Sequence, residues 1–296
     1  MTDSSRKDKP TADIGILGGT GLYDMEGIQD LRTLELKTPF GWPSDAYTLG
    51  VLEGKRIAFL SRHGRGHRIL PSEINYRANV YGFKILGVSR IISVNSVGSL
   101  KEEIKPRDLV FPDQFYDKTH RDCSFFGGGV VAHIGFANPV CSDMSRVLYE
   151  TGKGMDLRVH NKGTYVCIQG PHFSTIAESQ IYRKWGCDVI GMTGVTEAKL
   201  CREAEICYAS MSLVTDYDVW HESEGPVSVE MILENMEKNV KNAKNLIKKA
   251  VKDLPECEDR ACECGDALKN AIVTDPSRIP SFTRKKIDLI ISKYLN

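Results

Sequence analysis

The chain has 296 residues, of which 41% are hydrophobic and 26% are charged, as in ordinary globular proteins. Its 39 basic residues balance its 39 acidic residues, so no overall field would attract it to nucleic acid or to a membrane surface. The sequence lacks a run of about 18 apolar residues, the length that a transmembrane helix needs. We therefore expect no nucleic acid and no membrane among its partners.

The first residues predict no folded structure. Residues 1–12, MTDSSRKDKPTA, are polar and charged and lack the apolar core of a signal peptide, so we expect a disordered leader. From residue 13 onward, hydrophobic runs alternate between strand and helix patterns, and nothing resembles a linker. We therefore expect a single α/β domain over residues 13–296, without internal repeats.

The predicted elements alternate along the whole domain. A hairpin over 45–64 turns at Glu53 and Gly54, and a helix over 72–87 has Ser72 as its N-cap and Gly87 just past its end. A helix over 228–252 has a continuous apolar face. The remaining strands are expected at 13–19, 90–98, 108–117, 164–169, 187–192 and 206–218, and the remaining helices at 142–153, 174–185 and 194–204.

Nine cysteines are distributed unevenly along the chain. Three of them, Cys257, Cys262 and Cys264, crowd the tail segment CEDRACECG, and the other six are scattered through the body. Scattered cysteines in apolar runs are typical of free thiols in a reducing compartment. A zinc site needs four ligands, and the tail offers three cysteines without a nearby histidine. We therefore expect free thiols and no metal, with a labile disulfide as the next alternative and zinc as the last.

Hydrogen-bond donors follow four of the predicted strands. They are Thr20 in the glycine loop GGTG, Arg62 and His63 at the start of the loop RHGRGH, Asn95 and Ser96 in VNSVG, and Thr193 in GMTG. In open α/β sheets, ligands bind at the carboxyl ends of the strands. Glycine-rich turns bring backbone N–H groups to an anion, and the arginine fork matches phosphate oxygens. This set of donors predicts an oxyanion site.

Two aspartates end the predicted strand 206–218. Asp216 and Asp218 are separated by one residue, so in an extended chain they would point to the same side. Two carboxylates that close resist ionising together, and one pKa rises. Because carboxylates repel an anion, we expect this pair at the other end of the ligand, facing N–H groups or a protonatable nitrogen.

Five segments together resemble the trimeric purine nucleoside phosphorylase family: GILGGTGLYD, SRHGRGHRILPSEINYRAN, VGSLKEEIKPRDLVFPDQFYDKT, GPHFSTIAES and GMTGVTEAKLCREAEICYASMSLVTDYDVW. The resemblance covers residues 13 to about 250, in the family's order. It implies a phosphorylase/hydrolase-like fold, in which a central mixed β-sheet is flanked by helices. It also implies a homotrimer with sites near the subunit interfaces, and neither a metal nor an organic cofactor. The tail beyond about residue 255 departs from the animal members.

The resemblance further implies a substrate and a set of binding residues. Inorganic phosphate would be the co-substrate, bound by the six donors named above. The nucleoside would be S-methyl-5'-thioadenosine, cleaved to adenine and 5-methylthioribose-1-phosphate in purine and methionine salvage. The expected location is the cytoplasm, with the nucleus as an additional one. The residues implied to line the nucleoside site are Met192 at the ribose, Phe173 and Ser174 at the base, Val229 and Ile232 at the 5'-methylthio group, and His133 from a neighbouring subunit.

The expected chemistry gives the two aspartates a role. Phosphorolysis of an N-glycosidic bond passes through an oxocarbenium-like state, as in glycosidases. Bound phosphate would attack C1' while an aspartic acid protonates N7 of the purine. We expect Asp216 to be this acid and Asp218 to accept from the 6-amino group. Two alternatives remain open: a 6-oxopurine nucleoside phosphorylase, for which Asn would suit the base better than Asp, and a catalytically inactive nucleoside-binding protein.

Overall fold

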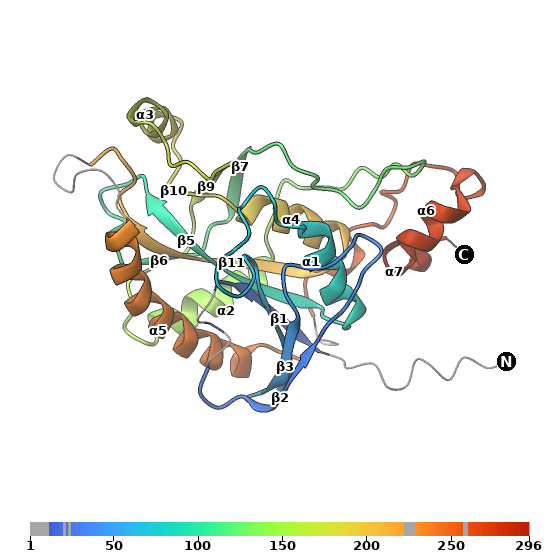
Figure 1. Cartoon of the computed structure of the whole chain (residues 1–296), viewed down its shortest axis with the longest axis horizontal. Helices are drawn as coiled ribbons and strands as arrows, with labels where there is room; N and C mark the ends of the chain where they lie inside the picture. Colours follow the sequence, from blue (N-terminus) through green and yellow to red (C-terminus); the bar gives the residue numbers. More distant parts are fainter. Residues whose placement is uncertain (1–11, 20–21, 23–24, 222–228, 257–259, 296) are drawn as a thin grey trace.

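A single mixed sheet forms the centre of the molecule (Figure 1). The computed structural model describes residues 12–19, 22, 25–221, 229–256 and 260–295, without the side chains of residues 229–234. The 11 strands within this part of the chain are β1 (Ile14–Gly18), β2 (Gln29–Leu34), β3 (Tyr47–Leu52), β4 (Lys55–Ser61), β5 (Arg90–Ser99), β6 (Leu109–Val110), β7 (Gln114–Lys118), β8 (Val159–His160), β9 (Thr164–Ile168), β10 (Val189–Gly191) and β11 (Cys207–Asp216).

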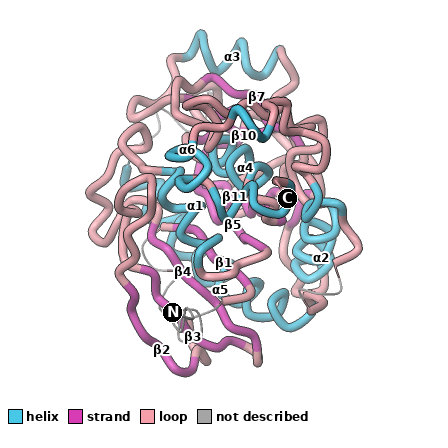
Figure 2. The backbone as a smooth tube through the Cα atoms, turned by 90° about the vertical axis from the view of Figure 1, so that its right-hand side faces the viewer, coloured by secondary structure: helices cyan, strands magenta, loops and turns pink. Residues whose placement is uncertain are grey.

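Helices cover both faces of this sheet. The described α-helices are α1 (Tyr76–Ile85), α2 (Ser142–Lys153), α3 (Ile176–Lys184), α4 (Gly194–Glu203), α5 (Val229–Asp253), α6 (Ser281–Lys286) and α7 (Asp288–Ile291). Buried side chains of α2 and α5 form one core with the sheet, and those of α1 and α4 form a second core on its other face. Figure 2 shows α3 at one end of the molecule and the β2–β3 hairpin at the opposite end. None of the helices in the described segments is long and apolar enough to cross a membrane.

The sheet combines parallel and antiparallel pairs. β5 is parallel to β1 and to β11, and it is antiparallel to β10. The hairpin of β3 and β4 adds an antiparallel edge. β1 and β11 are buried along their whole lengths, as expected for strands covered on both faces. The prediction of a mixed sheet flanked by helices is confirmed.

Turn chemistry explains the hairpin that the sequence predicted. Glu53 and Gly54 both have positive φ, 50° and 77°, and they connect β3 to β4 with Leu52 opposite Lys55. A two-residue connection with both residues in the left-handed region matches the twist of the flanking strands. The predicted turn position is therefore correct.

Several elements differ from the prediction. Helix α1 begins at Tyr76 and its N-cap is Asn75, whose side chain accepts from the backbone N–H of Ala78; Ser72 was therefore the wrong cap, and Asn serves this position equally well. The predicted strand 108–117 is two strands, β6 and β7, interrupted around Pro112, which lacks a ladder N–H. Strands β2 and β8 were not predicted, because β2 is a polar, exposed edge strand and β8 has two residues.

The tail after α5 packs onto the domain. Leu268, Ile287 and Ile291 are almost fully buried and belong to the core that α1 and α4 form with the sheet. An isolated bridge joins Ala132 to Ile272, so the segment between β7 and α2 runs beside the tail. Figure 1 shows both segments on the side of the molecule that carries α6 and α7, away from α3.

Candidate active site

Strand β5 changes neighbours along its length. Its first half pairs with β1, ending with Leu17 opposite Ser93, and its end pairs with β10, where Ile190 lies opposite Gly98. β11 remains paired along the other edge of β5. Between Ser93 and Gly98 the sheet therefore opens into a fork, bounded by the ends of β1 and β10. Such a change of strand partner is where open α/β sheets bind ligands.

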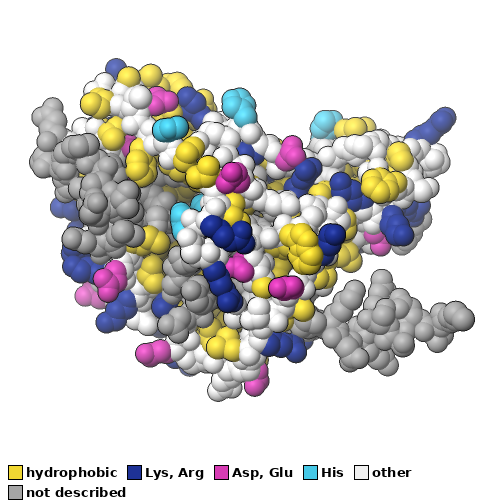
Figure 3. All heavy atoms as spheres, in the orientation of Figure 1, with side chains coloured by type: hydrophobic (Ala, Val, Ile, Leu, Met, Phe, Trp, Pro, Cys, Tyr) yellow, Lys and Arg dark blue, Asp and Glu magenta, His cyan; other side chains and the backbone are white. Residues whose placement is uncertain are grey.

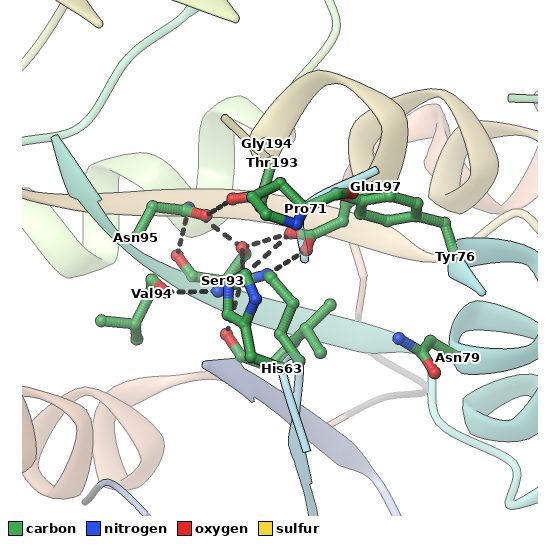
Figure 4. Close-up of polar contacts among 12 residues, drawn as sticks. His63, Pro71, Tyr76, Asn79, Ser93, Val94, Asn95, Thr193, Gly194 and Glu197 are labelled. Atoms are coloured by element: carbon green, nitrogen blue, oxygen red, sulfur yellow. Dashed lines mark hydrogen bonds and ion pairs between the residues drawn. The ribbon is translucent and has the colours of Figure 1, made fainter. Parts of the chain in front are cut away.

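Arg62 follows β4 and lies in this fork with 3% of its side chain exposed. Its guanidinium is ion-paired with Glu197 of α4 and donates to the carbonyl of Val94 at 3.0 Å (Figure 4). Burial lowers the pKa of Arg62, but the Glu197 carboxylate raises it, and the net shift is upward. Nη1 has Val94 as its single acceptor in the described structure, so its second N–H is free to bind an anion.

Glu197 is the residue of the fork that the sequence analysis missed. Its side chain is 0% exposed, and besides Arg62 it accepts from the hydroxyls of Ser93 at 2.6 Å and Tyr208 at 3.2 Å. Glu197 lies 135 positions from Arg62 in the chain, which hides the pairing. One signal was present: in the segment GVTEAKLC, Glu197 is the single acidic residue, and apart from Lys199 its neighbours are small or apolar.

His63 lies beside Arg62 and is held as a neutral ring. Its Nδ1 is 2.8 Å from the carbonyl of Ile69, and since a carbonyl can only accept, Nδ1 carries the proton. Burial first and the charge of Arg62 second lower the pKa of His63 to about 4. The ring stacks on His67 at a centroid distance of 4.3 Å. Near neutral pH, Nε2 is therefore a hydrogen-bond acceptor.

Asn95 and Thr193 join the two arms of the fork. The Thr193 hydroxyl donates to Oδ1 of Asn95 at 2.8 Å, and the Asn95 amide donates to Ser93 at 3.1 Å and Ser210 at 3.0 Å (Figure 4). These contacts use both N–H groups of the Asn95 amide, so it orients Thr193 and has no spare N–H for an anion. Ser96, in contrast, is exposed.

The fork also contains the beginning of a helix. Thr193 is the N-cap residue of α4, and no side chain caps the helix, because the Thr193 hydroxyl is turned to Asn95. The first N–H groups of a helix lack acceptors within it and carry the positive end of its dipole. A phosphate bound at this position accepts hydrogen bonds from these N–H groups, and its negative charge interacts favourably with the helix dipole.

The aspartate pair lies at the end of β11, close to Gly98 of β5. A Cβ built on Gly98 would come within 2.8 Å of Oδ1 of Asp216, so only glycine fits there. Asp216 accepts from the Thr215 hydroxyl at 2.7 Å and from the backbone N–H of Asp218 at 2.8 Å. Asp218 has φ 53°, so the chain turns after Asp216 and the extended alternation assumed in the sequence analysis does not hold. The backbone of Asp218 contacts the Asp216 carboxylate, and that the two carboxyls act as a pair stays a prediction.

The environments of the two aspartates differ. Burial raises the pKa of the Asp218 carboxyl, and the nearby Ser179 and Ser174 hydroxyls lower it only in part. Within the described residues, Oδ2 of Asp218 and both of these hydroxyls are buried without a hydrogen bond of normal geometry. Asp216 instead accepts two hydrogen bonds, which favours its ionised form. A ligand that donates or accepts beside Asp218 would satisfy all three orphan groups.

Other predicted nucleoside-site residues lie around this end of the fork. Ser174 is half-buried beside Asp218, whereas Phe173 is exposed over 48% of its surface. Met192 follows β10 directly and precedes Thr193, and its carbonyl accepts from Arg121 at 2.6 Å. A Cβ on Gly170 would reach within 2.6 Å of the Met192 sulfur. The loop before α3 therefore packs directly on Met192.

Four predicted residues are not placed at the fork by the described structure. Thr20 and the side chains of Val229 and Ile232 lie outside the described residues. His133 is exposed and its backbone N–H donates to Ala271 of the tail at 2.9 Å, so it lies with the tail and not with the fork of its own chain.

The similarity to known proteins extends over the whole domain. The model of the phosphorylase superfamily matches residues 13–252. An S-methyl-5'-thioadenosine phosphorylase of Geobacter sulfurreducens is 55% identical over 284 residues, which cover 95% of this chain and 99% of that protein. The crystal structure of a methylthioadenosine phosphorylase from an antarctic soil metagenomic library has a TM-score of 0.91 at 45% identity, covering 95% of this chain and 99% of the other. A mutant adenosine/methylthioadenosine phosphorylase from Schistosoma mansoni, in complex with methylthioadenosine, has a TM-score of 0.74 at 37% identity, covering 81% and 91%.

Proposed function

The chain belongs to the phosphorylase superfamily, and from this premise we propose that it catalyses phosphorolysis of S-methyl-5'-thioadenosine. The products are adenine and 5-methylthioribose-1-phosphate, which places the reaction in purine and methionine salvage. One observation carries the proposal: Asp216 is in register with Gly98, three residues along β5 from Asn95, or about 10 Å. This spacing suits a phosphate at the fork, a ribose beside it, and a purine at the carboxyl pair.

The fork binds the co-substrate, inorganic phosphate. The start of α4, the second Nη1 hydrogen of Arg62 and the exposed Ser96 supply donors. Nε2 of His63 accepts, so we assign it to the P–OH group of HPO₄²⁻, which leaves the charged oxygens for the donors. Held in this way, the dianion attacks C1' and offsets the charge of the oxocarbenium-like state. This chemistry uses no metal and no organic cofactor.

The carboxyl pair binds and protonates the base. We assign the proton to Asp218, whose pKa is raised and whose buried Oδ2 has no hydrogen-bond partner among the described residues. We assign N7 of the purine as its target. Asp216 is then the ionised member and accepts from the 6-amino group. This reverses the roles expected from the sequence, in which Asp216 was the acid. A leaving group protonated at N7 departs as neutral adenine.

The same pair favours adenine over a 6-oxopurine. A 6-oxo group presents lone pairs where adenine presents N–H, so the ionised Asp216 would face another acceptor. A buried mismatch of this kind costs about 1–3 kcal/mol. The 6-oxopurine alternative is therefore disfavoured, and the buried, ordered carboxyls give no support to an inactive binding protein.

Helix α5 delivers the pocket for the 5' group. Asn235 and Asn239 of α5 donate to the carbonyls of Thr215 and Val214, each at 2.8 Å, so the beginning of the helix is tied to the end of β11 beside Asp216. We place Val229 and Ile232, in the first turn of α5, against the methylthio group. Apolar side chains there favour a thioether over a hydroxyl.

We propose a homotrimer in which His133 of one subunit reaches the site of the next. Exposed apolar side chains occur around α3 and on the tail. Figure 1 shows α3 and the tail helices on opposite sides of the molecule, and Figure 3 shows exposed hydrophobic side chains over the tail. Two different surfaces that fit each other make a head-to-tail contact, which closes into a ring when the rotation allows. The α3 patch lies near the carboxyl pair and consists of Phe173, Ile176 and Trp185. The tail patch lies beside His133 and consists of Val131, Val273 and Phe282.

The compartment we propose is the cytoplasm. None of the eight described cysteines is in a disulfide, which suits a reducing environment. The Geobacter relative is bacterial, so nothing among the relatives described above supports the nuclear location that the sequence analysis allowed.

The test is adenine release from S-methyl-5'-thioadenosine by the purified chain, with and without phosphate. We expect release that depends on phosphate, with formation of the sugar phosphate. Inosine serves as the matched 6-oxopurine substrate. Equal release without phosphate would identify a hydrolase, and faster cleavage of inosine would overturn the assignment of the base pocket.

A further inference from the structure

Four cysteines from distant parts of the chain meet away from the fork. Cys141 is the N-cap residue of α2, Cys207 is the first residue of β11, and Cys262 and Cys264 lie at the short helical turn Glu263–Asp266 of the tail. Their four Sγ atoms all lie within 4.8 Å of one another. Cys141, Cys207 and Cys264 are buried and Cys262 is partly buried. The sequence analysis considered only the tail cysteines, and the fold supplies the two missing ligands.

The spacing of the sulfurs fits a tetrahedral metal site. Zinc bonds to thiolate at about 2.3 Å, and structural zinc sites are tetrahedral, so the sulfurs of a four-cysteine site lie about 3.8 Å apart. The Sγ atoms of Cys207 and Cys262 are 3.3 Å apart, and the remaining pairs fall within the same 4.8 Å limit. All four sulfurs thus surround one common centre, as a single metal ion requires. Two disulfides would require only that the sulfurs lie close together in two separate pairs.

The surroundings of the cluster favour charged sulfurs. Nη1 of Arg202 is 4.0 Å from the sulfur of Cys264, and Nη1 of Arg260 is 3.8 Å from the sulfur of Cys207. Four thiolates around one Zn²⁺ carry a net charge of about −2, and two guanidinium groups offset this charge and donate to the sulfurs. Four neutral thiols in an apolar core would need neither cation.

We propose that Cys141, Cys207, Cys262 and Cys264 bind one zinc ion, which fastens the tail to β11 and α2. Four protein ligands leave no open position, so the role is structural and not catalytic. The distance between the cluster and the proposed active site supports this structural role. Cys207 begins β11 and Asp216 ends it, nine residues or about 30 Å apart along the strand. The proposal does not depend on the reaction at the fork.

Metal and thiol analysis of the unaltered protein is the first test. After purification without chelators, we expect about one zinc per chain, with X-ray absorption showing four sulfur ligands at about 2.3 Å. After denaturation in the presence of a chelator and without reductant, the thiol reagent 5,5'-dithiobis(2-nitrobenzoate) should count nine free thiols, one for each cysteine of the chain. Zinc below about a tenth of an equivalent per chain, after growth with added zinc, would overturn the proposal. A count that is four thiols short would also overturn it, because it would indicate two disulfides.

Variants locate the metal. Cys264→Ser is expected to lose the zinc and to lower the thermal unfolding midpoint, whereas Cys123→Ser, a half-buried cysteine outside the cluster, should keep both. Prolonged EDTA treatment should lower the midpoint of the unaltered protein to that of Cys264→Ser. Full zinc content in Cys264→Ser would overturn the ligand assignment. If this variant does not fold, the metal content of the unaltered protein still decides the question.

Discussion

Arg62 and Glu197 form an ion pair inside the fork, with 3% and 0% of their side chains exposed. The carboxylate cancels the charge of the guanidinium and fixes its direction. Arg62 therefore offers phosphate one N–H in a defined position. The start of the neighbouring helix α4 adds positive electrostatic potential. The pair thus acts by positioning.

Replacing Glu197 by Gln should destabilise the protein by about 3–5 kcal/mol, because a buried charge is left without its partner. We also expect the phosphate KM to rise and the nucleoside KM to change little. Glu150→Gln, at an exposed position of α2, is the control. The double variant Arg62→Met/Glu197→Leu should recover stability relative to Glu197→Gln but remain inactive. An unchanged thermal midpoint in Glu197→Gln would contradict the role of the pair.

Asp218→Asn should lower kcat by roughly 10²–10⁴-fold, since the proton donor is removed. Its backbone should be unaffected, because φ at this position is 53° and Asn tolerates the left-handed region. Asp216→Asn should act more on the nucleoside KM. In the unaltered enzyme kcat/KM should fall as pH rises through the raised pKa of Asp218. The opposite ranking of the two variants would restore Asp216 as the acid.

His63 should make the protein less stable in acid. Its pKa is lowered from 6.5 to about 4 in the folded chain, so between these values the unfolded chain binds more protons and the unfolding free energy falls as pH falls. In His63→Asn this loss should be smaller, since the amide can still donate to Ile69 but does not titrate. Thermal midpoints measured from pH 7 to pH 4 check this, and parallel curves for the two proteins would count against it.

Asn95→Ala should raise the phosphate KM by about tenfold, because Thr193 loses the acceptor that orients it and about 1–1.5 kcal/mol of interaction is removed. Ser96→Ala, at the exposed neighbouring position, should have a smaller effect on the same constant. Initial rates at varied phosphate and at varied nucleoside separate the two constants. A change confined to the nucleoside KM would contradict the assignment of Asn95 to the phosphate-binding part of the site.

The unaltered enzyme should prefer S-methyl-5'-thioadenosine to adenosine by roughly 10–100-fold in kcat/KM, because a buried unpaired hydroxyl costs about 1–3 kcal/mol. Val229→His should reduce this preference by offering a hydrogen-bond partner to the 5'-hydroxyl. Competition between the two nucleosides in one assay gives the ratio directly. Equal use of both by the unaltered enzyme would remove the apolar pocket from the proposal.

The sequence was sufficient for the sheet, most helices and the grouping of donors at strand ends. Hydrophobic periodicity located α2 at its observed bounds, and the glycine at 54 fixed the hairpin turn. Short or exposed elements were missed, because β2 and β8 lack a distinct pattern of apolar residues.

Interactions between distant residues were beyond the sequence. The partner of Arg62 lies 135 positions away, and a buried carboxylate has no periodic signal. Asn95 was predicted to bind the anion, and in the structure its amide is consumed by Thr193 and two serines. The cysteine cluster shows the same difficulty, because the tail motif contains only half of its ligands.

Amide hydrogen exchange should divide the site into a slow and a fast side. All ten residues of β11 are buried, so the strand that ends at Asp216 should exchange only when the whole domain unfolds. Helix α3 buries only Ser179 and Tyr182, and its amides should open at a far lower free energy. Since the loop before α3 carries Ser174 and packs on Met192, the nucleoside would enter and leave by local opening on that side, while Asp216 at the end of β11 stays in place.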